Sequence, residues 1–224
     1  MKKFLLLTGM ILVTNIANAE TEFYTSVKMG IGGTTIYVNN DDELGDYLVK
    51  DSGPGYRYSD TGLLWEMSAA VGIDWSPRKM YVKQDPNEWF HLRLEGEFGY
   101  NNYHKNGKLM YDYAVTDNIE IKSNNFFALV NGYTDFKIDS IVPYLGLGIG
   151  YSFGNEETKL INSHGTFSDS VDADGIIYAL HLGVGYKYSD ITTFDLGGRR
   201  VYAPAEDSGK VIFDTVRLGV RFRI

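Results

Sequence analysis

Residues 216–224, at the C-terminal end of the sequence, are VRLGVRFRI, in which apolar residues alternate with arginine or glycine. A period of two is typical of a β-strand with one apolar and one polar face. The apolar face of this strand would consist of Val216, Leu218, Val220, Phe222 and Ile224. The same alternation recurs along the chain and decides the fold.

Seven further segments show this pattern. Every second residue from Leu63 to Trp75 is apolar, and a similar series begins at Phe90. By contrast, the longest purely apolar run, 126–130, is far shorter than the roughly 20 residues that a membrane-spanning helix needs. The sequence predicts eight strands, at 22–37, 62–75, 89–102, 117–134, 141–153, 175–188, 192–202 and 211–224.

The connections between these strands differ in length. Short turns are expected at 137–140 and 189–191, and a longer connection with two prolines at 76–88. Long loops at one end of the strands and short turns at the other are typical of an outer-membrane β-barrel. The sequence therefore predicts an all-β, eight-stranded antiparallel up-and-down transmembrane β-barrel over residues 20–224. Its long polar loops would be 38–61, 103–116, 154–174 and 203–210.

A soluble β-sandwich is the main alternative, because it would also alternate apolar and polar residues. Aromatic residues, however, cluster near the ends of the predicted strands, as they do at the two interfaces of a membrane. They are Tyr24, Trp75, Trp89, Tyr100, Tyr133, Tyr151, Tyr186 and Tyr188. Together with the different loop lengths, this distribution favours the barrel.

The N-terminus has the features of a secretory signal. Lys2 and Lys3 form a basic region, an uncharged and mostly apolar stretch follows at 4–16, and Ala-Asn-Ala at 17–19 is a typical cleavage site. We therefore expect residues 1–19 to be removed as a signal peptide, so that the mature chain is secreted, which is compatible with the bacterial envelope.

Composition excludes several functional classes. The chain of 224 residues has no cysteine, which rules out disulfides and thiolate metal sites. Its formal net charge of −8 disfavours nonspecific binding to nucleic acid, which requires a basic surface. We expect no nucleic-acid partner, and a monomer in the membrane.

Several motifs resemble one family of small barrels. These are the LRLEGEF stretch at 92–98, NGYTDF at 131–136, PYLGLGIGY at 143–151, and LGVGY at 182–186 followed by DLG at 195–197. Together they resemble the OmpA transmembrane domain, OmpX and the opacity-type surface antigens, all of them eight-stranded outer-membrane barrels. The chain departs from this pattern in having Gly-Arg-Arg at 198–200 and Ile224 as its last residue. The resemblance implies an integral protein of the cell outer membrane, in contact with its lipid and lipopolysaccharide.

Charged residues fall on the face opposite the apolar one in most predicted strands. An eight-stranded barrel has an interior that side chains just fill, so charges there must pair. The sequence predicts an ion-pair plug centred on Arg93, Glu95, Glu97 and Arg217, with inward-facing glycines making space for it. The remaining expected members of this lumen charge cluster are Lys28, Glu66, Lys122 and Arg221.

The C-terminal strand also looks like the assembly signal of outer-membrane barrels. Its apolar face, Val216, Leu218, Val220, Phe222 and Ile224, resembles the motif that the barrel assembly machinery reads. The same residues would face lipid as part of the last strand, and the two roles are compatible.

Catalytic and metal-binding residues are sparse in the sequence. His91 and His181 are expected inside the barrel as hydrogen-bonded side chains, while His164 lies in a predicted loop with Asp169. A loop rarely holds the geometry that a serine nucleophile and its histidine need. We therefore predict no catalytic site, no metal site and no cofactor.

The long loops are the expected location of specific function, because 38–61 and 154–174 are rich in Asp and Glu. The predicted function is a structural, surface-antigen or adhesin role displayed through acidic extracellular loops, with a host surface ligand as a further expected partner. Two alternatives stay open: a narrow or gated pore for small solutes, and an outer-membrane lipid-modifying enzyme.

Overall fold

The computed structural model describes residues 20–37, 57–58, 62–76, 90–111, 114–162, 165–172, 174–204 and 210–224. The expected signal peptide, 1–19, and the connection at 77–88 lie outside the described residues. So do most of the predicted loop 38–61 and residues 205–209.

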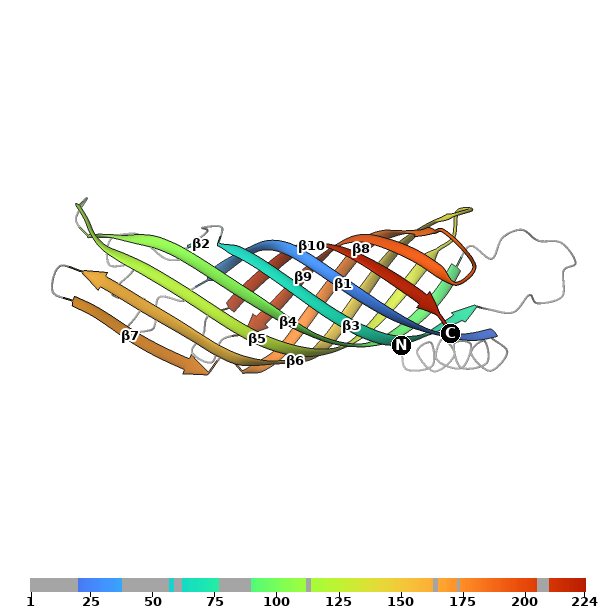
Figure 1. The fold of residues 1–224 in the computed structure, drawn as a ribbon, viewed down its shortest axis with the longest axis horizontal. Helices are drawn as coiled ribbons and strands as arrows, with labels where there is room; N and C mark the ends of the chain where they lie inside the picture. Colours follow the sequence, from blue (N-terminus) through green and yellow to red (C-terminus); the bar gives the residue numbers. More distant parts are fainter. Residues whose placement is uncertain are drawn as a thin grey trace, which may run out of the picture.

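Eight long antiparallel strands of the described chain close into a barrel (Figure 1). Each strand pairs with the next in the sequence, and the first and last strands pair from Tyr24↔Arg223 to Tyr37↔Lys210. This arrangement confirms the predicted fold class. The eight strands are β1 (Glu20–Tyr37), β3 (Leu63–Ser76), β4 (Phe90–Tyr111), β5 (Ala114–Phe136), β6 (Ile141–Asn162), β8 (Gly175–Lys187), β9 (Thr192–Pro204) and β10 (Lys210–Arg223).

Two shorter strands lie outside this ring of eight. β2 (Arg57–Tyr58) pairs with the end of β1, and β7 (Gly165–Asp172) pairs with β6. β7 runs in the same direction as β8 and precedes it directly in the sequence, so it prolongs the β8 side of the barrel wall.

The outer surface carries an apolar belt that matches a membrane in height. On β8, alternate residues from Ile176 to Tyr186 are all apolar or aromatic and all exposed. At about 3.3 Å per residue and a tilt near 45°, this segment is roughly 23 Å tall. Outer-membrane barrels have an apolar band of about 25 Å, so this outward face is the lipid-facing one.

The two short turns lie at the same end of the barrel. They are at 137–140, where Asp139 has a positive φ of 54°, and at 189–191. The backbone of Arg223 donates to the Ile191 carbonyl and that of Ile224 to Phe23, so the beginning of β1 and the end of β10 also lie here. We call this the turn end and the opposite one the loop end. By the usual asymmetry of such barrels we expect the turn end to be periplasmic.

At the loop end, two of the predicted loops are wrong over most of their length. The segment 103–116 is largely strand, because β4 continues to Tyr111 and β5 begins at Ala114. The segment 154–174 is also largely strand, because β6 continues to Asn162 and β7 follows. The four strands β4 to β7 therefore project beyond the rest of the barrel, at the left of Figure 1.

The physical reason for this error is the solvent. A strand at membrane depth must present an apolar face to lipid, which creates the period of two. Beyond the membrane the ladder hydrogen bonds continue, but the outward face contacts water and the apolar period disappears. β5 has 23 residues and is about 50 Å tall at the same tilt, twice the height of the belt.

No helix in the described part of the chain is long and apolar enough to cross a membrane.

Candidate functional site: a charge-filled lumen

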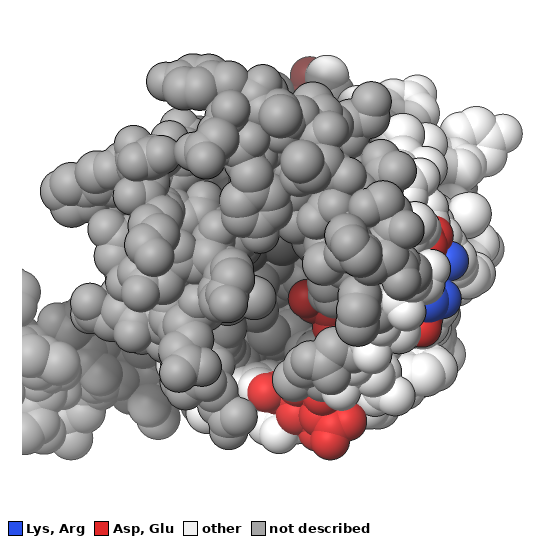
Figure 2. Space-filling view, turned by 90° about the vertical axis from the view of Figure 1, so that its left-hand side faces the viewer, with Lys and Arg blue, Asp and Glu red and all other residues white. Residues whose placement is uncertain are grey.

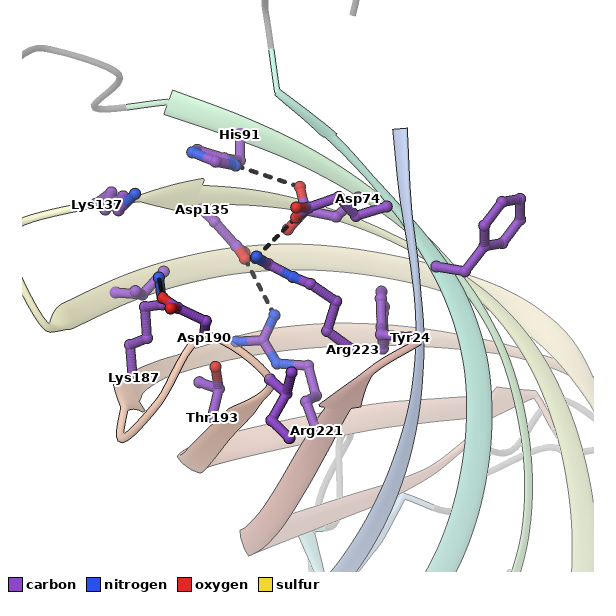
Figure 3. A pocket seen from close by; sticks show the side chains of 14 residues that line it. Tyr24, Asp74, His91, Asp135, Lys137, Lys187, Asp190, Thr193, Arg221 and Arg223 are labelled. Carbon is purple, nitrogen blue, oxygen red and sulfur yellow. Dashed lines mark hydrogen bonds and ion pairs between the residues drawn. The ribbon is translucent and has the colours of Figure 1, made fainter. Parts of the chain in front are cut away.

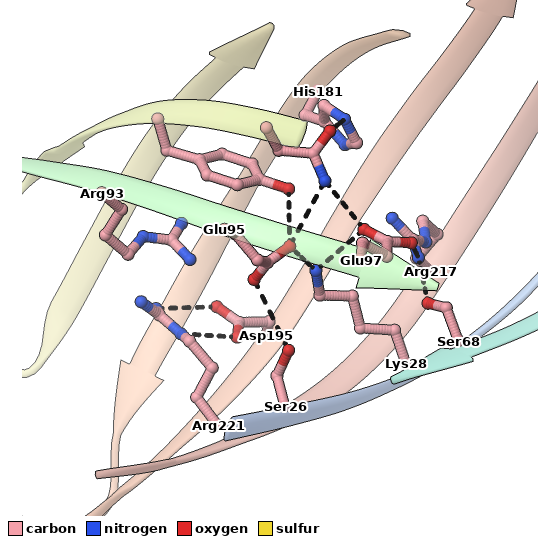
Figure 4. Close-up of polar contacts among 12 residues, drawn as sticks. Ser26, Lys28, Ser68, Arg93, Glu95, Glu97, His181, Asp195, Arg217 and Arg221 are labelled. Atoms are coloured by element: carbon pink, nitrogen blue, oxygen red, sulfur yellow. Dashed lines mark hydrogen bonds and ion pairs between the residues drawn. The ribbon is translucent and has the colours of Figure 1, made fainter. Parts of the chain in front are cut away.

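The inward faces of the strands fill the barrel with charged side chains, and Figure 4 shows the middle of this network. Two groups can be distinguished. A central cluster lies around Glu66, Glu95 and Glu97, and a second cluster around Asp135 and Asp195 lies nearer the turn end. All five carboxylates are buried, so each requires a cation or hydrogen-bond donors.

In the central cluster, Glu97 and Glu66 share two arginines. Arg217 contacts Glu97 through Nη2 and Glu66 through Nε, the latter at 2.8 Å. Arg199 also pairs with both, and its Nη1 lies 3.4 Å from Glu97 Oε1. The Thr215 hydroxyl also donates a hydrogen bond to Glu66, at 3.1 Å. Four strands are thus tied together across the lumen.

Glu95 is the most extensively bonded carboxylate of this cluster. It pairs with Lys28 Nζ, which also lies 3.1 Å from Glu97 Oε2. The Tyr24 hydroxyl donates to Glu95 at 3.1 Å and the Tyr133 hydroxyl at 3.3 Å. Ser26 and Asn131 also donate to it, at 3.5 and 3.4 Å. Glu95 is fully buried, and its partners come from β1 and β5.

The second cluster is built on two arginines that share Asp135. Arg93 Nε lies 2.7 Å from Asp135 Oδ2, and its Nη2 donates to Oδ1 at 3.0 Å. Arg221 Nη1 lies 3.4 Å from the same carboxylate. Arg221 also binds Asp195 in bidentate fashion, at 2.9 and 3.0 Å. Bidentate arginine–carboxylate pairs are directional as well as strong, so this cluster fixes β4, β5, β9 and β10 relative to one another.

Aromatic rings connect the two clusters. The Arg93 guanidinium lies 4.2 Å from the ring centroid of Tyr133 and 5.3 Å from that of Tyr144, within the range of a cation–π contact. Since the Tyr133 hydroxyl donates to Glu95, one ring contacts both clusters. The space for these side chains comes from glycines. A Cβ on Gly72 would lie 2.3 Å from the Tyr24 ring, and one on Gly148 would lie 2.2 Å from Asn131 Oδ1.

The ions linked by these contacts balance in number. Five carboxylates (Glu66, Glu95, Glu97, Asp135 and Asp195) face five cations (Lys28, Arg93, Arg199, Arg217 and Arg221). A cavity that adjoins both clusters has a volume of about 20 Å³, room for about one water molecule.

Toward the loop end, apolar side chains cover the central cluster. The Arg199 guanidinium lies 4.5 Å from the ring centroid of Phe127. Phe127 belongs to a buried group with Leu129, Ile177, Ala179 and Val201, all on inward faces. A second buried group consists of Leu64, Tyr103 and Ile121. The lumen is therefore ionic in its lower part, and above it the apolar groups lie beside buried polar side chains such as Asn101, Lys105 and Asn125.

The turn end contains a small charged mouth, shown in Figure 3, with a cavity of about 70 Å³. His91 on β4 lies 3.3 Å from Asp74, and Arg223 lies 2.7 Å from Glu22. In the turn, the hydrogen bond from Lys187 lowers the pKa of Asp190. Acidic and basic groups both line the mouth, so its cavity does not favour anions over cations.

The structure places most of the sequence-predicted lumen residues inside the barrel. Lys122 is different: its position on β5 faces outward, its side chain is 40% exposed, and it pairs with Glu120 at 2.7 Å. Its predicted place in the lumen is therefore wrong, because inward positions on β5 have odd numbers. Arg93 also pairs outside the expected centre, with Asp135 in the second cluster. The residues found inside are Lys28, Glu66, Arg93, Glu95, Glu97, Arg217 and Arg221.

Sequence reasoning missed Arg199, Asp135 and Asp195. The alternation itself could have found them. Phe194 and Leu196 face outward, so Asp195 and Arg199 must face inward. His181 is buried, as expected, and its Nε2 lies 3.1 Å from Asn131 Oδ1.

Two further features of the sequence prediction are the loop histidine and the C-terminal strand. Residues 163 and 164 are not among the described residues, so the loop histidine, His164, has no described position. Within the described ranges, no group of three or more His, Cys, Asp or Glu side chains is placed to hold a metal ion. The apolar face of the C-terminal strand points outward, and Val216, Leu218, Phe222 and Ile224 are exposed.

Comparison with known proteins found no matching family model and no similar curated protein. Solved structures with a similar fold include Neisserial surface protein A (NspA), with 15% identity over 92% of this chain and 99% of that one, at a TM-score of 0.43. Ail, the attachment invasion locus protein of Yersinia pestis, shows 15% identity over 90% and 99%, at 0.44. The N-terminal barrel of Pseudomonas aeruginosa OprF shows 15% identity over 89% and 97%, at 0.37.

The geometry itself defines the class of protein. Eight antiparallel strands of the described chain close into a ring around a polar interior, and the outer surface is an apolar belt of membrane height. This chain is an eight-stranded outer-membrane β-barrel.

Proposed function

We propose that this protein is a non-conducting outer-membrane barrel that displays an extracellular sheet as a surface antigen or adhesin. In this proposal residues 1–19 are a cleaved signal peptide and the mature chain begins at Glu20. The barrel is the anchor, and the projecting strands β4 to β7 carry the function. Its partners are outer-membrane lipid and lipopolysaccharide, together with a host surface ligand.

The packed lumen is the observation that carries this proposal. Ten paired ions and an apolar layer occupy the interior, and the cavity adjoining both clusters holds about one water molecule. A solute pore requires a continuous water path, so this packing argues against the pore alternative. An ion that crossed the barrel would have to break buried pairs, each of which costs several kcal/mol to disrupt.

The projecting sheet supports the display role. β4, β5, β6 and β7 rise beyond the apolar belt, and acidic side chains outnumber basic ones on the described part of the loop end (Figure 2). Asp172 and Asp174 are exposed there. An acidic surface of this kind is complementary to a basic partner.

Shortening the projecting hairpin tests the proposal. Asn106 and Glu120 pair across β4 and β5, so replacing 107–119 with Asn-Gly keeps the register and removes the tip of the hairpin. Intact cells carrying the wild type should bind host cells, and the shortened variant should lose most of that binding while still folding. A control with Asn-Gly at 189–190, at the turn end, should bind as the wild type does. Equal binding by the shortened variant would contradict the proposal.

A further inference from the structure

The outer surface of the described chain carries a continuous group of five aromatic rings on strands β3 to β6, larger than the exposed pair Tyr188–Phe194. Tyr100, Phe126 and Phe153 are direct cross-strand partners on β4, β5 and β6. Their ring centroids are 5.1 Å apart for Tyr100–Phe126 and 5.9 Å for Phe126–Phe153. Trp65 adds a fourth ring, 5.4 Å from Tyr100, and Phe98 a fifth, 6.1 Å from Phe126. We call these five rings the aromatic row.

One step closer to the loop end, each of the three strands changes to asparagine. Asn102, Asn124 and Asn155 are cross-strand partners in the same register. Asn124 Oδ1 accepts hydrogen bonds from the Tyr100 hydroxyl at 2.7 Å and from Asn102 Nδ2 at 2.6 Å. We call these three residues the amide row. Tyr100, Asn102 and Asn124 therefore form one hydrogen-bonded group at the upper edge of the rings.

Beyond the amide row, charges of both signs compensate each other. Lys122 lies 2.7 Å from Glu120, and Lys159 lies 3.0 Å from Glu157. His104 lies 3.8 Å from Glu120. These exposed pairs have no net charge when the histidine is neutral, so this surface is not a phosphate site.

The aromatic row, the amide row and the charged pairs follow one another toward the loop end, and this order marks the outer boundary of the membrane. On β6, the outward residues change from Leu147, Ile149 and Phe153 to Asn155. The opposite wall has aromatic residues near its own upper limit, the cross-strand partners Tyr178 and Tyr202, but they are not part of a joined group of rings like the aromatic row. An aromatic girdle alone requires only scattered rings, so the joined rings and registered amides on β3 to β6 are a distinct feature.

We propose that the aromatic and amide rows form a binding site for the sugar headgroup of an outer-leaflet glycolipid of the lipid A type. Acyl chains would lie along the apolar belt below, and the C–H faces of the sugar would pack on the rings. The amide row would hydrogen-bond to the sugar hydroxyls and amides. The outer leaflet of this membrane supplies such a lipid at the required depth, and the neutral charge of the surface assigns recognition to the sugar and not to its phosphates.

Native mass spectrometry of the protein in nanodiscs tests this site. The discs contain phosphatidylglycerol with a small fraction of purified lipid A. Both lipids are anionic, so a preference for lipid A cannot come from negative charge alone. Wild-type protein should retain lipid A in preference to phosphatidylglycerol, with little dependence on salt. Trp65→Leu and Asn124→Leu should each lower this retention about tenfold, the effect of one lost stacking or hydrogen-bond contact.

Tyr202→Leu, on the opposite wall, is the matched control and should retain lipid A as the wild type does. A heat-modifiability gel establishes that every variant is folded. Three results would overturn the site: equal retention by all variants, retention that salt abolishes, or a protein dimer that Trp65→Leu dissociates in discs without lipid A. Equal binding of deacylated lipid A sugar to the protein in detergent would show that the surface takes a soluble glycan instead of a membrane lipid.

Discussion

Glu95 is the residue on which the central ion cluster depends most directly. Its carboxylate is fully buried and accepts from Lys28, Tyr24 and Tyr133. Glu95→Ala removes this acceptor and leaves buried donors without a partner, which should lower the free energy of unfolding by about 3–5 kcal/mol. Urea unfolding in lipid vesicles measures the change. Asp190→Ala, in the exposed turn, should leave stability unchanged, and an equally stable Glu95→Ala would contradict the network.

The lipid face makes a separate prediction at the same scale. Leu147 is 68% exposed at a position within the apolar belt of β6. Leu147→Arg should cost roughly 2–4 kcal/mol, as charged residues do near the middle of the bilayer. On the same strand and the same face, Asn155→Arg lies above the belt and should cost less than about 1 kcal/mol. Similar folding of the two variants into vesicles would mean that the assigned membrane depth is wrong.

Individual lumen residues could be predicted from the sequence where apolar and polar residues alternate without interruption, because this alternation shows which side chains face inward. Glu95 and Glu97 lie two positions apart opposite apolar neighbours, and the structure places both inside. Lys122 is misplaced because Ser123 and Asn125 interrupt the alternation of β5. Arg199 was missed for another reason. Its outward-facing neighbour is Gly198, which has no side chain and therefore does not mark the lipid face in the sequence.

At the scale of the strands, the apolar period predicted the part of each strand that lies in the membrane and little beyond it. The ends of β8 and β9 differ from expectation by one or two residues. β4 continues nine residues past its expected end at residue 102. Cross-strand pairing of polar residues in water produces no period of two in hydrophobicity, so the projecting sheet could not be predicted from the pattern that revealed the barrel.

The projecting part of β4 and β5 should therefore behave as a sheet in solution. Backbone amides from Tyr103 to Asn106 and from Glu120 to Asn125 pair across the two strands, so they should exchange with solvent deuterium slowly. Asp139 and Ser140, in a tight turn, should exchange much faster. Hydrogen exchange with mass spectrometry on the folded barrel measures both. Exchange of the projecting segment at the rate of the turn would mean that it is a loop after all.

The last strand, β10, has a role in closure and, we propose, in delivery to the barrel assembly machinery. Its outward residues include Leu218 and Phe222, and its inward residues include Arg217. Phe222→Ser should therefore reduce the amount of folded barrel in the outer membrane of living cells, while the purified variant refolds into vesicles much as the wild type does. Similar loss in both assays would indicate a purely structural role for this residue.

For the whole molecule, the central claim is that the barrel is an anchor with a closed lumen. Three layers occupy the interior: the charged mouth, the two ion clusters and the apolar groups toward the loop end. The ion clusters and the apolar groups are built from inward residues of the barrel strands, and the short turns contribute to the mouth, so closure belongs to the barrel itself.

Planar-bilayer recording on the purified, folded protein tests this claim most directly. A heat-modifiability gel first establishes that the sample is a folded barrel. The closed lumen predicts no steady conductance steps from the wild type at either polarity. Reproducible steps that scale with the amount of folded protein would contradict it and would make the protein a pore.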